Sequence, residues 1–495
     1  MSNRNKISIF EEPALEFGAG QRLQHPRDGI SLFGPYDTKG VEKPRHICYA
    51  TFGTETGRRQ FQTFSYKLTK PIQTSDDLSE ILWPSFPGFE EAFHAVWPSQ
   101  ETWFGDISEQ DVQQACAIQD SHQRVYSVVN LYLNAMQVAK HRDDAFDVFV
   151  CIVPDVVYSS CRVLSSVGKT LSGKERRLRS VMGDFFADYE SDQYQFSLDF
   201  RRQIKARAME FGVPIQIVRE STLRLNLPQS FSERQLTPLS DRAWNLATTL
   251  YYKAGGKPWR LSTAREGVCY IGIAFKSTED KTLNACSAAQ MFLDDGDGIV
   301  FMGEEGTWQS PKKGDFHLSK LAARNLLHGV LTTYSEQRGQ PLKEVFLHCR
   351  SSLNDDEFTG YQEACPTNVK LTCIRVAPER LGLRAYRPGT RPVMRGTFWE
   401  VSEKRGFLWA SGFKPRLRTY DGSEVPQPLC IDIQRGEGDI ETIATDILGL
   451  TKLNYNCCKL GESQPVTIHF SDAVGEILVA NRKSGKVLPN FKYYI

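Results

Sequence analysis

The stretch Phe146-Asp147-Val148-Phe149-Val150-Cys151-Ile152-Val153-Pro154 is short and almost continuously apolar. Such a run is typical of a strand that is buried on both faces of a parallel sheet. A helical pattern follows over residues 200–211, then a candidate strand over residues 215–218 and a candidate helix over residues 240–253. The alternation of strand and helix predicts an α/β unit with a parallel sheet.

A second α/β unit is expected after residue 267. Residues 268–275 form a candidate strand, residues 290–293 and 299–302 a hairpin, and residues 318–337 a helix. A further strand is expected over residues 344–348, and the rest of the chain is richer in β-type patterns.

The first 125 residues form a mixed α/β segment that is rich in turn signals. Strand-like runs lie at residues 47–52 and 60–68, and one helical pattern extends from about residue 108 to residue 140. We therefore expect this segment to accompany the first α/β unit.

The composition is that of an ordinary globular protein. The 495 residues suggest roughly two to four domains. The 60 basic and 59 acidic residues give a net charge of +1, which excludes a global polycation but leaves room for a local basic patch. The 12 cysteines contain no C-x-x-C pair, which predicts reduced thiols and a cytoplasmic location. We expect neither a signal peptide nor a membrane-spanning segment.

Four short segments carry a resemblance to a known family. They are Glu12-Pro13-Ala14-Leu15-Glu16-Phe17-Gly18, His25-Pro26-Arg27-Asp28-Gly29, Phe33-Gly34-Pro35-Tyr36 and Leu450-Thr451-Lys452-Leu453-Asn454-Tyr455-Asn456. Together they resemble the prokaryotic Argonautes. The resemblance implies a Rossmann-like MID domain at residues 126–262, after the segment 1–125, and an RNase H-like PIWI domain at residues 263–495. Separate N and PAZ domains have no room, so the chain resembles a short Argonaute.

The resemblance also implies a site for the 5′ phosphate of a guide strand. The residues that match it are Arg201, Lys205, Gln216, Lys253 and the chain end at Ile495. In the family the glutamine and the terminal carboxylate help to hold a divalent cation, which predicts Mg²⁺ at Gln216 and Ile495. Arg201 and Lys205 are one helical turn apart and share a face. The alternative for Arg201 and Lys205 is a solvated helix face. The alternative for Lys253 is a charge at the end of a helix, and that for Ile495 is a frayed chain end.

A catalytic PIWI domain needs carboxylates that hold two metal ions for phosphodiester hydrolysis. Ala274 stands where the resemblance expects the first carboxylate, and Arg350 stands near the second. Asp472 aligns with the fourth position. We therefore expect a PIWI domain that is not a nuclease.

Three other groups of residues have two or three interpretations each. The acidic run Asp294, Asp295 and Asp297 fits a hairpin turn or a metal site. The run Asp355-Asp356-Glu357 fits a solvated loop, a helix start or a metal site. His348, at a strand end, fits a buried core histidine or a ligand.

Residues 370–418 carry the strongest charge signal. They hold twelve basic and three acidic residues, a local net charge of +9. Arginine forks match phosphate oxygens, which predicts contacts with a nucleic-acid backbone, chiefly through Arg384, Arg387, Arg391 and Arg395. The alternative is an ordinary surface that acids elsewhere balance. Most of the interleaved aromatic side chains are expected in the core.

The resemblance as a whole implies a catalytically inactive short Argonaute. It would bind a guide RNA, recognise complementary single-stranded DNA, and activate an associated effector in prokaryotic defence against plasmids and phages. The effector would carry an Argonaute-associated (APAZ-like) domain fused to a TIR-type or sirtuin-like NAD hydrolase, or to a nuclease. The alternatives are an autonomous guide-directed endonuclease and a stand-alone binder that blocks targets.

Overall fold

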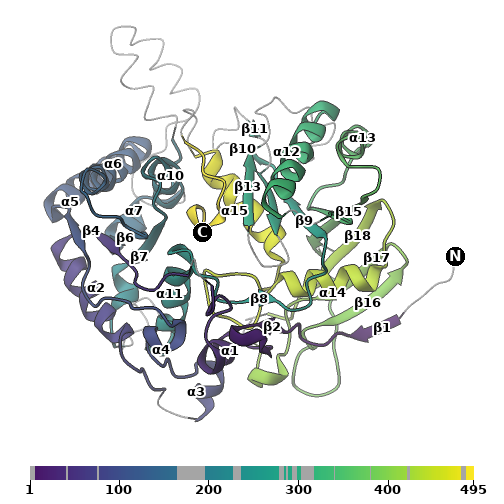
Figure 1. Cartoon of the computed structure of the whole chain (residues 1–495), viewed down its shortest axis with the longest axis horizontal. Coiled ribbons are helices and arrows are strands. Elements are labelled where there is room, and N and C mark those ends of the chain that lie inside the picture. Colours follow the sequence, from purple (N-terminus) through teal and green to yellow (C-terminus); the bar gives the residue numbers. More distant parts are fainter. Residues whose placement is uncertain are drawn as a thin grey trace, which may run out of the picture.

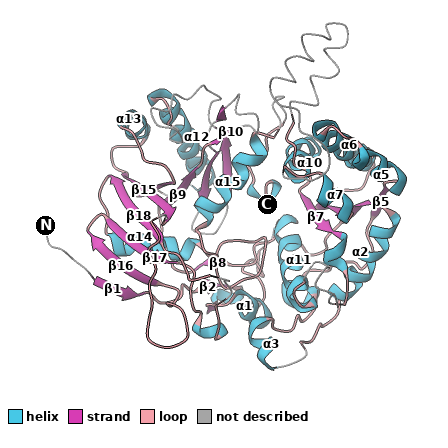
Figure 2. Cartoon of the chain, turned by 180° about the vertical axis from the view of Figure 1, so that it is seen from behind, coloured by secondary structure: helices cyan, strands magenta, loops and turns pink. Residues whose placement is uncertain are grey.

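The computed structural model describes most of the chain. The described residues are 6–40, 43–74, 77–163, 196–226, 236–277, 284–285, 288–292, 298–302, 317–338, 341–379, 381–420, 424–480 and 486–495. Two α/β units lie side by side, and residue 495 lies between them in both views (Figures 1 and 2).

The first unit is built on a four-stranded sheet in which all neighbouring strands are parallel, in the order β5-β4-β6-β7. The strands are β4 (Tyr49–Gly53), β5 (Trp103–Asp106), β6 (Val148–Val153) and β7 (Ile215–Arg219). This confirms the buried parallel strand expected at residues 146–154. Two of its strands precede residue 126, so the sheet does not follow the division expected at residue 125.

Helices cover both faces of this sheet. Val150 and Ile152 pack with α2 (Glu55–Leu68) and α11 (Leu239–Lys253), whereas Phe149 and Cys151 point into a second cluster. That cluster includes α5 (Glu109–Ala117), α6 (Ser121–Lys140), α7 (Asp155–Ser160) and α10 (Phe200–Ala208). Neighbouring residues of β6 face opposite sides of the sheet, and both sides are covered by helices. All of its residues are therefore apolar.

The strand expected at residues 60–68 is wrong, because these residues belong to helix α2. The Thr54 side chain accepts a hydrogen bond from the Gly57 amide and caps the helix start. Buried side chains then recur at helical spacing, at Phe61, Phe64 and Leu68. Alternation over a few residues resembled a strand, but the three- and four-residue spacing decides the structure.

The helix expected over residues 108–140 is two helices, α5 and α6. Asp120 accepts a hydrogen bond from the Gln123 amide at 2.9 Å and starts a new helix there. The break follows from this N-cap, which competes with continuation of the first helix.

The second unit is built on a nine-stranded mixed sheet in the order β1-β16-β17-β18-β15-β14-β9-β12-β13. Its strands are β1 (Lys6–Ile9), β9 (Val268–Ile273), β12 (Ala288–Phe292), β13 (Gly298–Met302), β14 (Glu344–Cys349), β15 (Lys370–Pro378), β16 (Thr397–Ser402), β17 (Arg405–Trp409) and β18 (Leu429–Arg435). Strand β14 is parallel to both β9 and β15, and the other pairs are antiparallel. The hairpin β12–β13 is confirmed, while its turn, with Asp294, Asp295 and Asp297, lies outside the described residues.

Helices also cover this sheet on both sides. The pairs are α12 (Lys320–Arg338) with α13 (Asp355–Ala364) on one face, and α14 (Ile440–Leu450) with α15 (Val466–Leu478) on the other. The remaining elements are α1 (Pro26–Phe33), α3 (Asp77–Leu82), α4 (Phe89–Phe93), β2 (Leu15–Glu16), β3 (Arg22–Leu23), β8 (Arg260–Leu261), β10 (Lys276–Ser277) and β11 (Asn284–Ala285). Within the described residues, no helix is both long and apolar enough to cross a membrane.

Two of the four segments that carry the family resemblance, those with Glu12 and Lys452, meet in a largely buried ion network. Arg395 Nε lies 2.8 Å from Glu12 Oε2, and Lys452 Nζ lies 2.8 Å from Glu12 Oε1. Arg395 also donates to Thr451 Oγ1 at 2.6 Å. These residues therefore tie the start of the chain to the segment around residue 450, which is a structural role.

One hydrophobic core runs through both units. It contains the fully buried Trp244 and Trp259 together with Phe346 of the nine-stranded sheet. The rings of Tyr252 and Tyr455, from the two units, lie 4.6 Å apart. The units are therefore packed on each other through a continuous apolar contact.

Candidate functional site

Two buried lysines converge on one main-chain oxygen between the two units. Helix α10 begins at the N-cap Asp199 and carries Lys205 on its buried face, and Lys253 is the last residue of α11. Lys205 Nζ donates to the main-chain oxygen of Ile495. Lys253 Nζ donates to the same oxygen at 2.6 Å and to the Ile215 carbonyl at 2.5 Å.

The electrostatics of this pair are unusual for lysine. Burial, reinforced by the charges of Lys253 and Arg201, holds the pKa of Lys205 well below its ordinary value. Burial, with the Arg201 charge as the next cause, lowers the pKa of Lys253 to about 7. Among the described residues neither lysine contacts a carboxylate side chain. Burial therefore penalises the charged forms of two amino groups that donate to main-chain oxygens, and a bound anion would favour those charged forms.

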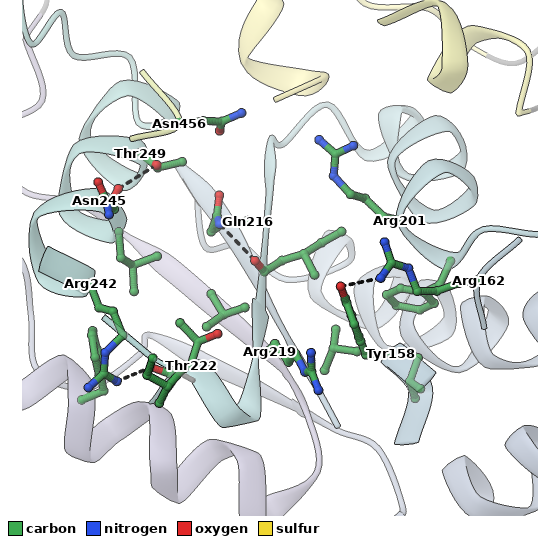
Figure 3. Close-up of a pocket in the computed structure, with 18 of the residues that line it drawn as sticks. Tyr158, Arg162, Arg201, Gln216, Arg219, Thr222, Arg242, Asn245, Thr249 and Asn456 are labelled. Carbon is green, nitrogen blue, oxygen red and sulfur yellow. Dashed lines mark hydrogen bonds between the residues drawn. The ribbon is translucent and has the colours of Figure 1, made fainter. Parts of the chain in front are cut away.

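A pocket of about 540 Å³ opens beside the lysines at the carboxyl ends of β6 and β7. Arg201, Gln216 and Asn456 surround one side of it (Figure 3). Arg201 is exposed, and the Gln216 side chain donates its amide hydrogen to the Ile217 carbonyl at 3.0 Å. The carboxyl ends of parallel strands are the common ligand position in open α/β sheets.

A tyrosine between two arginines lines the other side of this pocket. The Arg219 and Arg162 guanidiniums lie 3.9 Å and 4.3 Å from the centre of the Tyr158 ring (Figure 3). Arg219 is also paired with Asp155 at the start of α7. The sequence analysis missed these residues. Their position at or near the carboxyl ends of two parallel strands, β6 and β7, was the available signal.

The structure brings the five residues predicted for the guide end into one region. Arg201 and Gln216 line the pocket, and Lys205, Lys253 and Ile495 form the hydrogen-bonded cluster next to it. The solvated alternative is wrong for Lys205, which is 3% exposed, whereas Arg201 on the same helix is exposed. Lys253 is the last residue of α11, as its alternative expected, but it is 0% exposed. Ile495 is 4% exposed, so it is packed and not frayed. The phosphate-binding role of the five residues stays a prediction.

The three residues predicted at the PIWI metal position are also neighbours. Ala274 and Arg350 follow the adjacent parallel strands β9 and β14, whose ends are in register. Arg350 Nη2 lies 2.7 Å from Asp472 Oδ2 on α15, and Lys276 Nζ lies 3.2 Å from Asp472 Oδ1. The sequence analysis missed Lys276. In the described part of the chain, no group of three or more His, Cys, Asp or Glu residues could hold a metal ion.

Two alternatives from the sequence are decided by contacts. Asn354 and Glu357 form a capping box, so the acidic run at residues 355–357 is a helix start. His348 is 1% exposed and its Nδ1 lies 2.9 Å from Thr467 Oγ1. Burial lowers the pKa of His348 to about 3, so it is a neutral core histidine.

The basic segment divides into an exposed loop and a buried arginine. Arg387 and Arg391 lie over the Phe413 ring, at 5.1 Å and 4.6 Å from its centre, and Arg384 is half-buried in the same loop. The side chain of Arg395 is only 1% exposed, and Glu12 and Thr451 occupy its donors. The role predicted for Arg395 in backbone binding is therefore wrong, because no phosphate can reach it.

Known proteins match this chain in structure and not in sequence. No protein-family model and no curated protein matches it. Clostridium butyricum Argonaute, solved with a guide DNA and a 19-mer target DNA, matches with a TM-score of 0.63 at 14% identity. The match covers 99% of this chain and 55% of that one. A. aeolicus Argonaute matches with a TM-score of 0.54 at 13% identity, over 99% and 56% of the two chains. The same protein with externally bound siRNA gives 0.55 at 14%, over 100% and 56%.

The chain therefore has an Argonaute-like fold with the expected MID and PIWI arrangement. It spans a little over half the length of the Argonautes that it matches.

Proposed function

We propose that this chain, which has an Argonaute-like fold, binds the 5′ phosphate of a guide strand and uses that guide to recognise a complementary nucleic acid. The observation that carries the proposal is the pair Lys205 and Lys253, which is buried, contacts no carboxylate side chain of the described residues and donates to the oxygen of Ile495. A terminal phosphate brings up to two negative charges and three strong acceptors. A phosphate would therefore supply the two ammonium groups with negative charge and with hydrogen-bond acceptors.

The neighbouring pocket suits the nucleotide that carries this phosphate. Arg201 supplies a further cation at the pocket edge, and Gln216 and Asn456 supply amide groups. The Mg²⁺ predicted at Gln216 and Ile495 stays part of the proposal. These residues offer oxygen ligands of the kind that Mg²⁺ prefers, but the ion would share the Ile495 oxygen with two lysines.

The finer parts of the proposal come from the family resemblance. They are an RNA guide, a single-stranded DNA target, a PIWI unit without nuclease activity, and a partner protein that carries the effector in prokaryotic defence. One observation supports the PIWI unit without nuclease activity: Arg350 and Lys276 both pair with Asp472 at the position where catalysis would need metal.

Guide binding is tested with Lys205→Met and Lys253→Met. Each variant should weaken a 5′-phosphorylated guide about ten- to 100-fold, because a charge-assisted contact contributes about 1.5–3 kcal/mol. A guide with a 5′ hydroxyl should be affected far less. Lys140→Met, which removes an exposed lysine at the end of α6, is the matched control. Equal losses for both guides would place the phosphate elsewhere.

Nuclease activity is tested directly on the guide-loaded chain. We expect no target cleavage with Mg²⁺ or Mn²⁺. Product that appears with the purified chain and is lost in Asp472→Ala would establish the autonomous endonuclease instead. Isolation of the chain from its native cell with no second polypeptide would favour the stand-alone binder.

A further inference from the structure

Three basic side chains stand in a row at the carboxyl ends of neighbouring parallel strands. Lys276 follows β9, Arg350 follows β14, and Arg375 lies on β15 in register with Cys349, the last residue of β14. All three are partly exposed: their side chains are 25%, 41% and 31% accessible to solvent. The row is thus open to solvent at one edge of the nine-stranded sheet.

Fixed acceptors hold the row in place. Asp472 bridges Lys276 and Arg350 with its two oxygens, and Gln464 Oε1 accepts from Arg350 Nη2 at 2.7 Å. Arg375 Nε donates to the main-chain oxygen of Arg350 at 3.1 Å, and Asp432 lies 3.4 Å from its Nη1. Arg350 makes these contacts through Nη2 alone. Within the described residues its Nε and Nη1 have no protein acceptor.

The donor set does not fit the two metal ions that the fold family implies. Ala274 offers a methyl group, Arg350 offers a cation, and both oxygens of Asp472 already face positive charge. A divalent ion here would lie against two cations with one shared carboxylate, which is far from the oxygen shell that such ions require. An anion fits this edge better than a cation.

The row is also connected to the candidate guide pocket. Glu476 on α15 lies 3.6 Å from Lys276 Nζ and 3.0 Å from Arg202 Nη2. Arg202 follows Arg201 in the first turn of α10. Helix α15 lies between α10 and β9 (Figure 1). Helix α10, which carries Arg201 of the pocket, and the row are therefore joined by ion pairs through α15.

We propose that Lys276, Arg350 and Arg375 bind phosphodiester groups of the guide–target duplex at the position where a catalytic relative would bind metal. Asp472, Asp432 and Gln464 are positioning residues that orient the cations. The proposal rests on the proposed function, because it requires a guide-loaded chain. In this arrangement the protein holds the backbone through fixed guanidinium donors and cleaves nothing.

The test is a scan with neutral methylphosphonate linkages placed one at a time along the target strand, and then along the guide. In the first scan the chain is loaded with an unmodified guide and the target carries the neutral linkage; in the second scan the guide carries the linkage and the target is unmodified. Target affinity is measured for wild type and Arg350→Gln. One or two linkages should lower the affinity of wild type about five- to tenfold and leave Arg350→Gln unchanged. Lys276→Gln should shift the sensitive linkage or remove it. Arg142→Gln, which removes an exposed arginine paired with Asp144 in the other unit, should behave as wild type.

Loss at the same linkages in wild type and in Arg350→Gln would overturn the proposal, as would a scan with no sensitive linkage in either strand. Guide loading is measured separately in every variant. If guides load normally but the loss from a neutral linkage adds to the loss from Arg350→Gln, only the phosphate contact of the row is contradicted. Failure of the wild-type chain to load any 5′-phosphorylated guide contradicts the proposed function instead.

Discussion

Lys253 is an ammonium group whose pKa lies at about 7 because its burial penalises the charged form, with Arg201 adding to that effect. In the unfolded chain the group returns to its ordinary value near 10.5. Between these values the unfolded state binds more protons, so the free protein gains stability as pH rises from about 7 toward 10. A bound phosphate acts in the opposite direction, because it favours the charged lysine.

Phosphate recognition should therefore weaken in alkaline solution. We expect the advantage of a 5′-phosphorylated guide over a 5′-hydroxyl guide to fall between pH 7 and pH 9, as Lys253 of the free protein loses its proton. Calorimetry in buffers of different ionisation enthalpy should show proton uptake on binding at pH 8. A phosphate advantage that is constant over this range would show that Lys253 does not titrate at the phosphate.

Arg395 is the residue whose replacement should cost the most stability in the basic segment. Arg395→Ala removes the bidentate partner of the partly buried Glu12 and leaves it paired with Lys452, and loss of one member of a buried ion pair costs about 3–5 kcal/mol. Denaturant unfolding should show this loss. Arg391→Ala, at an exposed position in the same segment, should stay within about 0.5 kcal/mol of wild type. Similar stability of both variants would contradict the buried network.

At the scale of elements, the contact between β9 and α15 depends on a residue without a side chain. A Cβ at Gly272 would overlap the main-chain oxygen of Thr467 in the first turn of α15. The helix can lie this close to the strand only where the strand carries glycine. Because α15 also carries Asp472 and Glu476, this contact sets the position of both carboxylates.

Gly272→Ala should therefore lower stability by about 1–3 kcal/mol, the usual cost of overpacking. It should also reduce target affinity, since α15 has to move away from β9. The measurements are denaturant unfolding and target binding by the guide-loaded chain. Gly438→Ala is the control, because the nearest atom there is the end of the flexible Ile443 side chain. Equal effects of the two substitutions would argue against the close contact.

At the scale of the whole molecule, the two α/β units share one core. Trp244 and Trp259 are fully buried in a cluster that extends into both sheets. Domains joined only by a polar interface usually unfold separately. A shared apolar core favours a single cooperative transition.

We expect scanning calorimetry to show one main unfolding transition for the free chain. Tyr455→Ala, which removes the ring that packs on Tyr252 and Trp259, should separate it into two. Two resolved transitions in wild type would mean that the units are energetically independent. A single transition retained in Tyr455→Ala would assign the coupling to other contacts.

The sequence by itself determined the local elements whose pattern is strong. The strands β6, β7, β9 and β14 and the helices α10, α11 and α12 were predicted, because apolar runs and helical spacing depend on neighbouring residues. It failed at α2, where a short run of alternating side chains resembled a strand and only the cap at Thr54 with the spacing of Phe61, Phe64 and Leu68 shows the helix. The four segments that resemble Argonaute motifs predicted the fold that structural comparison supports.

Only the tertiary structure decided which charges are buried and what they face. Lys205, Lys253 and Ile495 are separated by up to 290 residues and meet at one oxygen atom. Arg395 and Arg391 look alike in the sequence, yet one is enclosed with Glu12 and the other is exposed. Lys276 became part of a site through Asp472, almost 200 residues further along the chain. The reason is physical: the cost of burying a charge and the partner that offsets it depend on segments brought together by folding, and no local pattern records them.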